Sequence, residues 1–76
     1  MTNSFTTTSI ANVDNEKEVA NLFETAKYYS KKELCTMYVM SNGETAVAIH
    51  DDYKEEFEDK GYWLAAIYVS GYRVDI

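Results

Sequence analysis

The densest group of reactive side chains in the sequence is a run of carboxylates near the middle of the chain. Residues 51–61 read Asp-Asp-Tyr-Lys-Glu-Glu-Phe-Glu-Asp-Lys-Gly, and six of the chain's 13 acidic residues fall within the first nine of these positions. Such a run can hold a metal ion or present negative charge to a basic partner. The six candidate site residues are Asp51, Asp52, Glu55, Glu56, Glu58 and Asp59.

A metal site is the less favoured interpretation of this run. A calcium-binding loop needs oxygen ligands at alternating positions and a glycine that allows a sharp turn. The run contains no glycine before Gly61, and carboxylates that project from a helix diverge. We therefore expect neither a metal nor another cofactor.

Cys35 and His50 are the only cysteine and the only histidine in the chain. The predicted strand pairing makes them cross-strand neighbours, with Asp51 next in sequence, and a Cys–His pair is a nucleophile arrangement in hydrolases. However, no oxyanion hole is evident, and a free cysteine is commonly a small buried hydrophobic residue. Zinc would need two further ligands. We therefore expect a protein that is not an enzyme.

The acidic run is predicted to be a short helix. Asp52 is a suitable N-cap with Glu55 placed for a capping box, and Gly61 suits the position after the last turn. At about 100° per residue, the six carboxylates fall within an arc of roughly 160°. Tyr53 and Phe57 lie on the opposite side and face inward.

This charge arrangement is unfavourable for an isolated helix. Six pairs of carboxylates, but only three Lys–carboxylate pairs, lie three or four residues apart within residues 51–60. At about 0.2–0.5 kcal/mol per pair, the net repulsion is on the order of 1 kcal/mol, partly offset by the helix dipole. Such a local conflict points to function, because stability alone would not select it. The competing interpretation is a solvated face that keeps a small apolar protein soluble.

A long amphipathic helix is predicted over residues 14–31. Asn12 and Asp14 are candidate N-caps, and Glu16 and Glu18 suit the first turns. Apolar residues then recur with helical spacing and form one stripe: Val19, Leu22, Phe23, Ala26 and Tyr29. Residues 1–11 are rich in Thr and Ser and are predicted to form either a short edge strand or a flexible tail.

Two β-hairpins flank the acidic run. In the first, Asn42-Gly43 predicts a two-residue turn. The resulting register pairs Ser41 with Glu44, Val39 with Ala46, Met37 with Ala48 and Cys35 with His50. The second turns at Ser70-Gly71 and pairs Val69 with Tyr72. Its predicted core face is wholly apolar or aromatic: Trp63, Ala65, Ile67, Val69, Tyr72, Val74 and Ile76.

Together these elements predict an α+β fold. A two-layer domain is expected, in which an antiparallel sheet of four to five strands, built from the two β-hairpins, carries the long amphipathic helix, and the short acidic helix connects the hairpins. The 76 residues are one domain, 1–76, with a small core.

Composition limits the class of partner. The formal net charge is −6, which disfavours direct binding to nucleic acid or to an anionic membrane surface and suits a basic protein. No stretch approaches the length of a membrane span, the N-terminus lacks the features of a signal peptide, and no intramolecular disulfide is possible. These features predict a cytoplasmic protein.

Two functional hypotheses follow. In size and charge the chain is similar to the small acidic inhibitors that phages use against host nucleases, polymerases or CRISPR complexes, although no motif carries this similarity. The first hypothesis is therefore a protein-binding module that docks its acidic face on a basic, nucleic-acid-handling partner. The alternative is a self-associating module, such as a homodimer, that uses hairpin edges or the apolar second face of residues 33–50.

Overall fold

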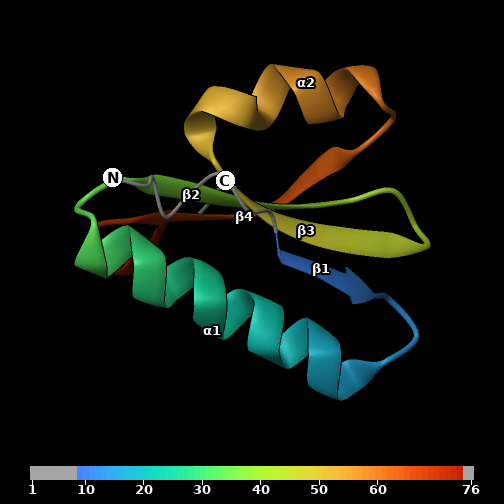
Figure 1. Cartoon of the computed structure of the whole chain (residues 1–76), viewed down its shortest axis with the longest axis horizontal. Coiled ribbons are helices and arrows are strands. Elements are labelled where there is room, and N and C mark those ends of the chain that lie inside the picture. The colour runs from blue at the N-terminus through green and yellow to red at the C-terminus, as the bar shows by residue number, and fades with distance from the viewer. Residues whose placement is uncertain (1–8, 75–76) are drawn as a thin grey trace, which may run out of the picture.

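The computed structural model describes residues 9–74. In chain order the elements are β1 (Ser9–Asn12), α1 (Glu16–Lys32), β2 (Thr36–Ser41), β3 (Thr45–His50), a 3-10 turn (Asp51–Tyr53), α2 (Lys54–Asp59), β4 (Trp63–Val69) and β5 (Tyr72–Val74). The strands form one antiparallel sheet in the order β1-β3-β2-β4-β5 (Figure 1). The predicted α+β fold, with two hairpins and two helices, is confirmed. The predicted edge strand is confirmed for Ser9–Asn12, and residues 1–8 lie outside the described part of the chain.

Helix α1 begins two residues later than predicted because a different side chain caps it. The Asn15 side chain accepts hydrogen bonds from the backbone N–H groups of Lys17 and Glu18, both at 3.1 Å, so neither Asn12 nor Asp14 is the N-cap. Asn12 instead accepts from the Asp14 N–H in the preceding turn. The predicted apolar stripe does face the sheet, with its middle residues fully buried: Leu22 and Ala26.

The register of the first hairpin differs from the prediction by two residues. Ser41 pairs with Ala46 and Met37 pairs with His50, so Cys35 has no cross-strand partner on β3. The turn is centred on Gly43-Glu44, one residue later than predicted, because the Asn42 N–H bonds to the Thr45 carbonyl at 3.1 Å. The Asn42 side chain supports this turn by accepting from the N–H groups of Glu44 at 2.9 Å and Thr45 at 2.8 Å. A shift of two residues returns each side chain to the same face, so the predicted faces are correct.

The second hairpin has the predicted register but the opposite core face. Val69 pairs with Tyr72 and Tyr68 with Arg73, around a turn in which Ser70 and Gly71 both have positive φ, as a type I′ turn requires. The deeply buried residues of β4 are Ala66 and Tyr68. The predicted core face is wrong, because its large members are substantially exposed: Trp63, Val69, Tyr72 and Val74. Ile76, assigned to the same face, lies outside the described residues.

A β-bulge explains how β4 changes faces along its length. Val39 of β2 pairs with Ala66, whereas the next residue, Met40, pairs with Leu64. Ala65 is therefore the extra residue, and Leu64 lies on the same face as Met40. A strict alternation of faces, which the prediction assumed, fails at this point.

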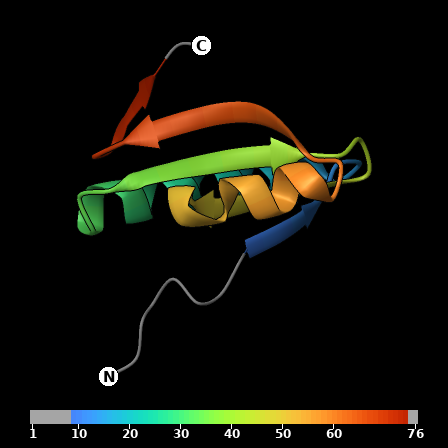
Figure 2. The same cartoon turned by 90° about the horizontal axis from the view of Figure 1, so that it is seen from above.

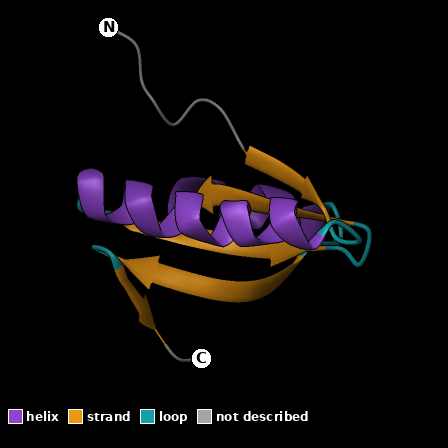
Figure 3. Ribbon diagram, turned by 90° about the horizontal axis from the view of Figure 1, so that it is seen from below, coloured by secondary structure: helices purple, strands orange, loops and turns teal. Residues whose placement is uncertain are grey.

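The sheet is covered by helices on both faces. Figure 3 views it from the α1 side, where α1 packs on a cluster that includes Met37, Val39 and Ala48. Helix α2 lies on the other face, over Met40, Val47 and Ile49 (Figure 1). The apolar second face of residues 33–50, suggested above as a surface for self-association, is thus largely buried under α2.

The C-terminus of α1 contains a strained residue. Cys35 N–H bonds to the Ser30 carbonyl at 3.0 Å and Leu34 N–H to the Lys31 carbonyl, the pattern of a Schellman motif. This places Leu34 in the position usually taken by glycine, with φ at 51° and 77% of its surface exposed. The left-handed conformation costs a non-glycine residue about 1 kcal/mol.

We expect Leu34→Gly to raise the free energy of unfolding by about 0.5–1 kcal/mol, because it relieves this strain and removes little buried surface. Urea denaturation measures the change. Gly61→Ala is the matched control: Gly61 has φ of 92° and open space around its missing Cβ, so alanine there should destabilise through backbone strain alone. A destabilised Leu34→Gly variant would contradict this account.

Candidate functional site

The acidic helix is held on the sheet by three aromatic side chains. Tyr53 and Phe57 pack against the buried residues Met40, Val47 and Ile49, as the helical geometry predicted. The Phe57 ring also meets the Tyr62 ring edge-on, with 5.2 Å between the ring centroids. These contacts fix which side of α2 faces water.

Helix α2 ends as predicted, with Gly61 at the position after its last turn. Tyr62 N–H bonds to the Phe57 carbonyl and Gly61 N–H to the Glu58 carbonyl, both at 3.0 Å. Gly61 therefore occupies the left-handed position of a Schellman motif. The Phe57–Tyr62 contact is the apolar contact that often accompanies this motif. The chain consequently leaves α2 in the direction of β4.

The N-terminus of the acidic segment is not capped as predicted. The His50 Nδ1 accepts a hydrogen bond from the Asp52 N–H at 3.2 Å, whereas no side chain caps α2 itself. The predicted N-cap role of Asp52 and the capping box with Glu55 are therefore wrong. The sequence signal that was missed is a histidine immediately before two aspartates, which can cap through its unprotonated ring nitrogen.

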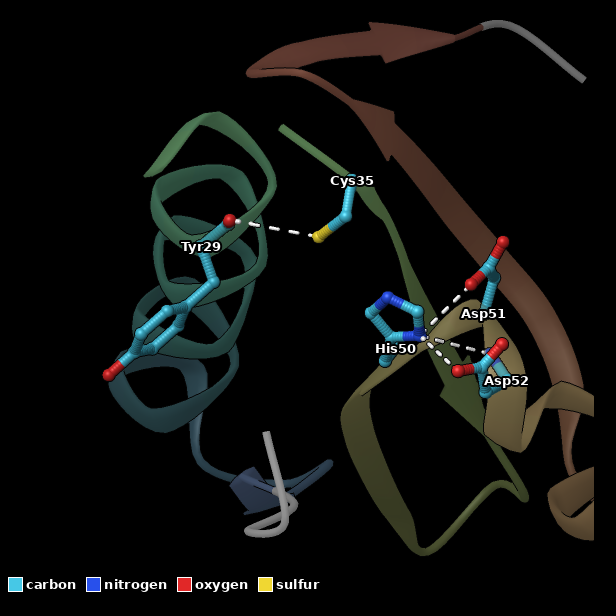
Figure 4. A network of polar contacts seen from close by, with 5 residues as sticks. All are labelled: Tyr29, Cys35, His50, Asp51 and Asp52. Carbon is cyan, nitrogen blue, oxygen red and sulfur yellow. Dashed lines mark hydrogen bonds and ion pairs between the residues drawn. The ribbon is translucent and has the colours of Figure 1, made fainter. Parts of the chain in front are cut away.

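His50, Asp51 and Asp52 form the tightest polar cluster of the site (Figure 4). The His50 Nδ1 lies 3.0 Å from Asp51 Oδ1 and 3.4 Å from Asp52 Oδ2. Within residues 9–74 this is the one group whose ligand atoms lie close enough to hold a metal ion, all within 4.8 Å of one another. A metal at Nδ1 would compete with the Asp52 N–H for the same lone pair, and both aspartates are exposed.

The two lysines of the segment lie on opposite flanks of α2. Lys54 pairs with Glu58 at 2.8 Å and sits over the Tyr38 ring, while Lys60 pairs with Glu56 at 3.6 Å. The hydrogen bond to Glu58 raises the pKa of Lys54. Both amines lie close to aromatic rings, since Lys60 is also 4.8 Å from the centroid of Phe57.

All six predicted carboxylates are exposed, and they lie together on one short segment, the 3-10 turn and α2. We call Asp51, Asp52, Glu55, Glu56, Glu58 and Asp59 the acidic face. Among the carboxylates of the acidic face that form ion pairs, Asp52 is the most exposed, with 80% of its side chain accessible to solvent. Glu55 and Asp59 have no ion pair within residues 9–74. Their charge is therefore offered to solvent or to a partner.

Cys35 and His50 do not form the predicted cross-strand pair. The Cys35 thiol instead hydrogen-bonds to the Tyr29 carbonyl, with 3.8 Å between sulfur and oxygen (Figure 4). Burial, with the charges of Glu33 and Asp51, raises the pKa of the Cys35 thiol. A raised pKa disfavours the thiolate, which is the nucleophilic form. The electrostatics here are opposite to those that activate a catalytic cysteine.

Comparison of the chain with protein-family models, with curated proteins and with solved structures finds no match in any of the three. Within residues 9–74, no helix is long and apolar enough to cross a membrane.

Glu55 takes part in four of the six repulsive pairs of the acidic face and in none of the three Lys–carboxylate pairs at this spacing. We expect Glu55→Gln to stabilise the protein by about 0.5 kcal/mol at low salt, after allowing for a weaker interaction with the helix dipole. The gain should shrink in high salt, which screens the repulsion. Glu58→Gln is the control, because it breaks the Lys54 ion pair and should give no gain. Urea denaturation at two salt concentrations measures both, and equal effects would contradict the assignment of repulsion to Glu55.

The raised pKa of Cys35 predicts slow alkylation by iodoacetamide at neutral pH and a midpoint of the pH–rate curve above that of a free cysteine. Because the folded-state pKa lies above the unfolded one, the stability linked to this group is present at neutral pH and is lost as the pH rises through the folded pKa. Asp51→Asn should move the midpoint down, since it removes one of the repelling charges. A fast reaction with a lowered midpoint would instead indicate an activated thiol.

Proposed function

We propose that this protein is a non-enzymatic, intracellular protein-binding module that docks its acidic face on a basic surface of a nucleic-acid-handling partner. The observation that carries the proposal is the placement of six exposed carboxylates on one short segment anchored by Tyr53 and Phe57. The aromatic contacts hold the charges in a fixed pattern against their mutual repulsion. A face needed for solubility alone would have no reason to concentrate them there.

The charge spacing supports a partner that normally binds nucleic acid. From Asp51 to Asp59 the segment spans about 12 Å at 1.5 Å per residue, which is one carboxylate per roughly 2 Å. Duplex DNA carries about one charge per 1.7 Å of axis. Lys54 and Lys60 reduce six negative charges to a net of −4, but both lie on the flanks of α2, in ion pairs. The outward side keeps most of the negative potential.

A surface of this kind competes with nucleic acid for a basic groove, because the same lysines and arginines that release counterions from phosphates would contact carboxylates instead. The partner class proposed is therefore a nuclease, a polymerase or a CRISPR complex, with inhibition as the result. The alternative proposal, self-association, is favoured by exposed apolar residues at the sheet edge formed by β5, chiefly Tyr72 and Val74.

The test compares two variants that change the net charge equally. Asp52→Asn, Glu55→Gln, Glu56→Gln and Asp59→Asn neutralise the acidic face, whereas Asp14→Asn, Glu24→Gln, Glu33→Gln and Glu44→Gln neutralise four exposed acids elsewhere, so both go from −6 to −2. Each immobilised variant and the wild type is used to capture proteins from a lysate at about 50 mM and about 500 mM salt. Bound proteins are identified by mass spectrometry, and duplex DNA is then added as a competitor.

The expected result is a partner retained at low salt by the wild type and the second variant, lost by the first, and released by DNA. Affinity for the first variant should fall at least about tenfold, since each charge pair at an interface commonly contributes more than 1 kcal/mol. Capture that is equal for both variants, or that DNA does not compete with, would contradict the proposal. Light scattering decides the alternative, because a dimer that is insensitive to the acidic face favours self-association.

A further inference from the structure

The β4–β5 half of the sheet has an uncovered apolar strip on its α2 side. The register places Ile67 and Val69 of β4 on the same face as Tyr72 and Val74 of β5. Tyr72 is 78% exposed, and Val69 and Val74 are 39% and 40% exposed. Neither of the two buried clusters within residues 9–74 includes any of these four residues, which we call the β4–β5 strip.

The strip is bare because α2 is too narrow and too far across the sheet to cover it. Five strands spaced about 4.8 Å apart span roughly 19 Å, whereas one helix with its side chains is about 10–12 Å wide. Figure 2, seen from the α2 side, shows α2 beside β2, with β4 and β5 on the other side of β2 and with no helix over them on this face. Because packed helices lie with their axes 8–10 Å apart, one additional helix alongside α2 would lie over β4 and β5 and extend slightly beyond the edge of the sheet.

The strip is held rigidly, because its turn is fastened to α1. Gly71 N–H donates to the Oγ of Ser30 at 2.9 Å, and Ser70 N–H donates to the Cys35 carbonyl at 3.1 Å. Ser30 is completely buried, and a Cβ on Gly71 would lie 2.9 Å from the Cβ of Lys31. The turn therefore packs closely on the end of α1, and the exposed apolar residues are presented on an ordered hairpin.

The border of the strip is negatively charged. Lys54 sits over the ring of Tyr38, which pairs with Ile67, so the flank of α2 that carries Lys54 and Glu58 is the one nearest β4. Glu55 lies next to this flank on the helical wheel. Two carboxylates and one lysine on this side of α2 thus give the border of the apolar surface a net negative charge.

We infer that the β4–β5 strip is the seat of a basic amphipathic helix from the partner, with apolar side chains on the strip and lysines or arginines against the carboxylates of α2. This inference rests on the proposed function and names the chemistry of the docking segment. A helix can lie alongside α2 at the usual 8–10 Å between axes, and its basic residues complement the net negative charge of the border. Burial of the strip provides affinity, and the acidic face provides specificity for a positively charged segment.

The probe is a synthetic peptide of about 18 residues, long enough to form a helix, with leucines on one stripe and lysines beside it. A second peptide carries glutamates in place of the lysines. Fluorescence anisotropy measures binding to the full chain. The lysine peptide should bind at least about tenfold more tightly than the glutamate peptide, and its affinity should fall with salt.

Matched variants locate the site. Tyr72→Ser with Val74→Ser should weaken the lysine peptide about tenfold or more, whereas Tyr28→Ser with Ile10→Ser, which removes an equally exposed pair outside the strip, should leave it unchanged. Glu55→Gln with Glu58→Gln should weaken binding more than Glu56→Gln with Asp59→Asn, because the latter pair lies away from β4. Circular dichroism confirms that each variant folds.

Equal binding of the two peptides, or equal losses in the two apolar double variants, would overturn the inference. A captured partner that is salt-sensitive, released by DNA and unaffected by the Tyr72/Val74 variant would overturn the inference while leaving the proposed function intact. If no partner depends on the acidic face, the proposed function itself fails. A stable homodimer that buries the strip and excludes the peptide would overturn the inference in favour of a second copy.

Discussion

The structure depends on one strand that must be covered on both faces. Ala46, Val47, Ala48 and Ile49 of β3 are all at most 5% exposed. Successive side chains of a strand point to opposite faces, so two apolar layers are required, one on each side of the sheet. Helix α1 provides the first and α2 the second. The acidic segment is therefore a structural element whose inner side closes the core, and its charges are placed outward as a consequence.

This constraint explains which features of the fold could be predicted from sequence. The stripe of α1 and the inward side of α2 follow from helical spacing, a local property that does not depend on neighbours. Gly61 was predictable for the same reason, because the left-handed position after a helix favours glycine. In the first hairpin the predicted faces are correct although the register is wrong. A register error of two residues leaves every side chain on the same face of the sheet.

The features that could not be predicted depend on contacts distant in sequence or on competition between similar patterns. Both faces of residues 63–69 read as apolar, so the sequence does not say which one meets α1; Tyr68 is buried and Val69 is exposed only because of where the helix lies. The bulge at Ala65 also moves the following residues of β4 to the opposite face, and no glycine or other turn residue in the sequence marks its position. At the candidate site, exposure of the carboxylates was predictable from helix geometry. The cap by His50 was not, because Asp52 is the more usual capping residue.

Two unfavourable features lie on the same side of the sheet and have a common remedy. The acidic face repels itself by an amount on the order of 1 kcal/mol, and the β4–β5 strip leaves apolar surface in water. Neither is needed to close the core, since β3 is already buried by α1 and α2. A single basic, apolar segment lying along α2 would relieve both at once, by pairing Glu55 and by covering Tyr72 and Val74. Two separate features of this side of the sheet thus favour the same kind of partner.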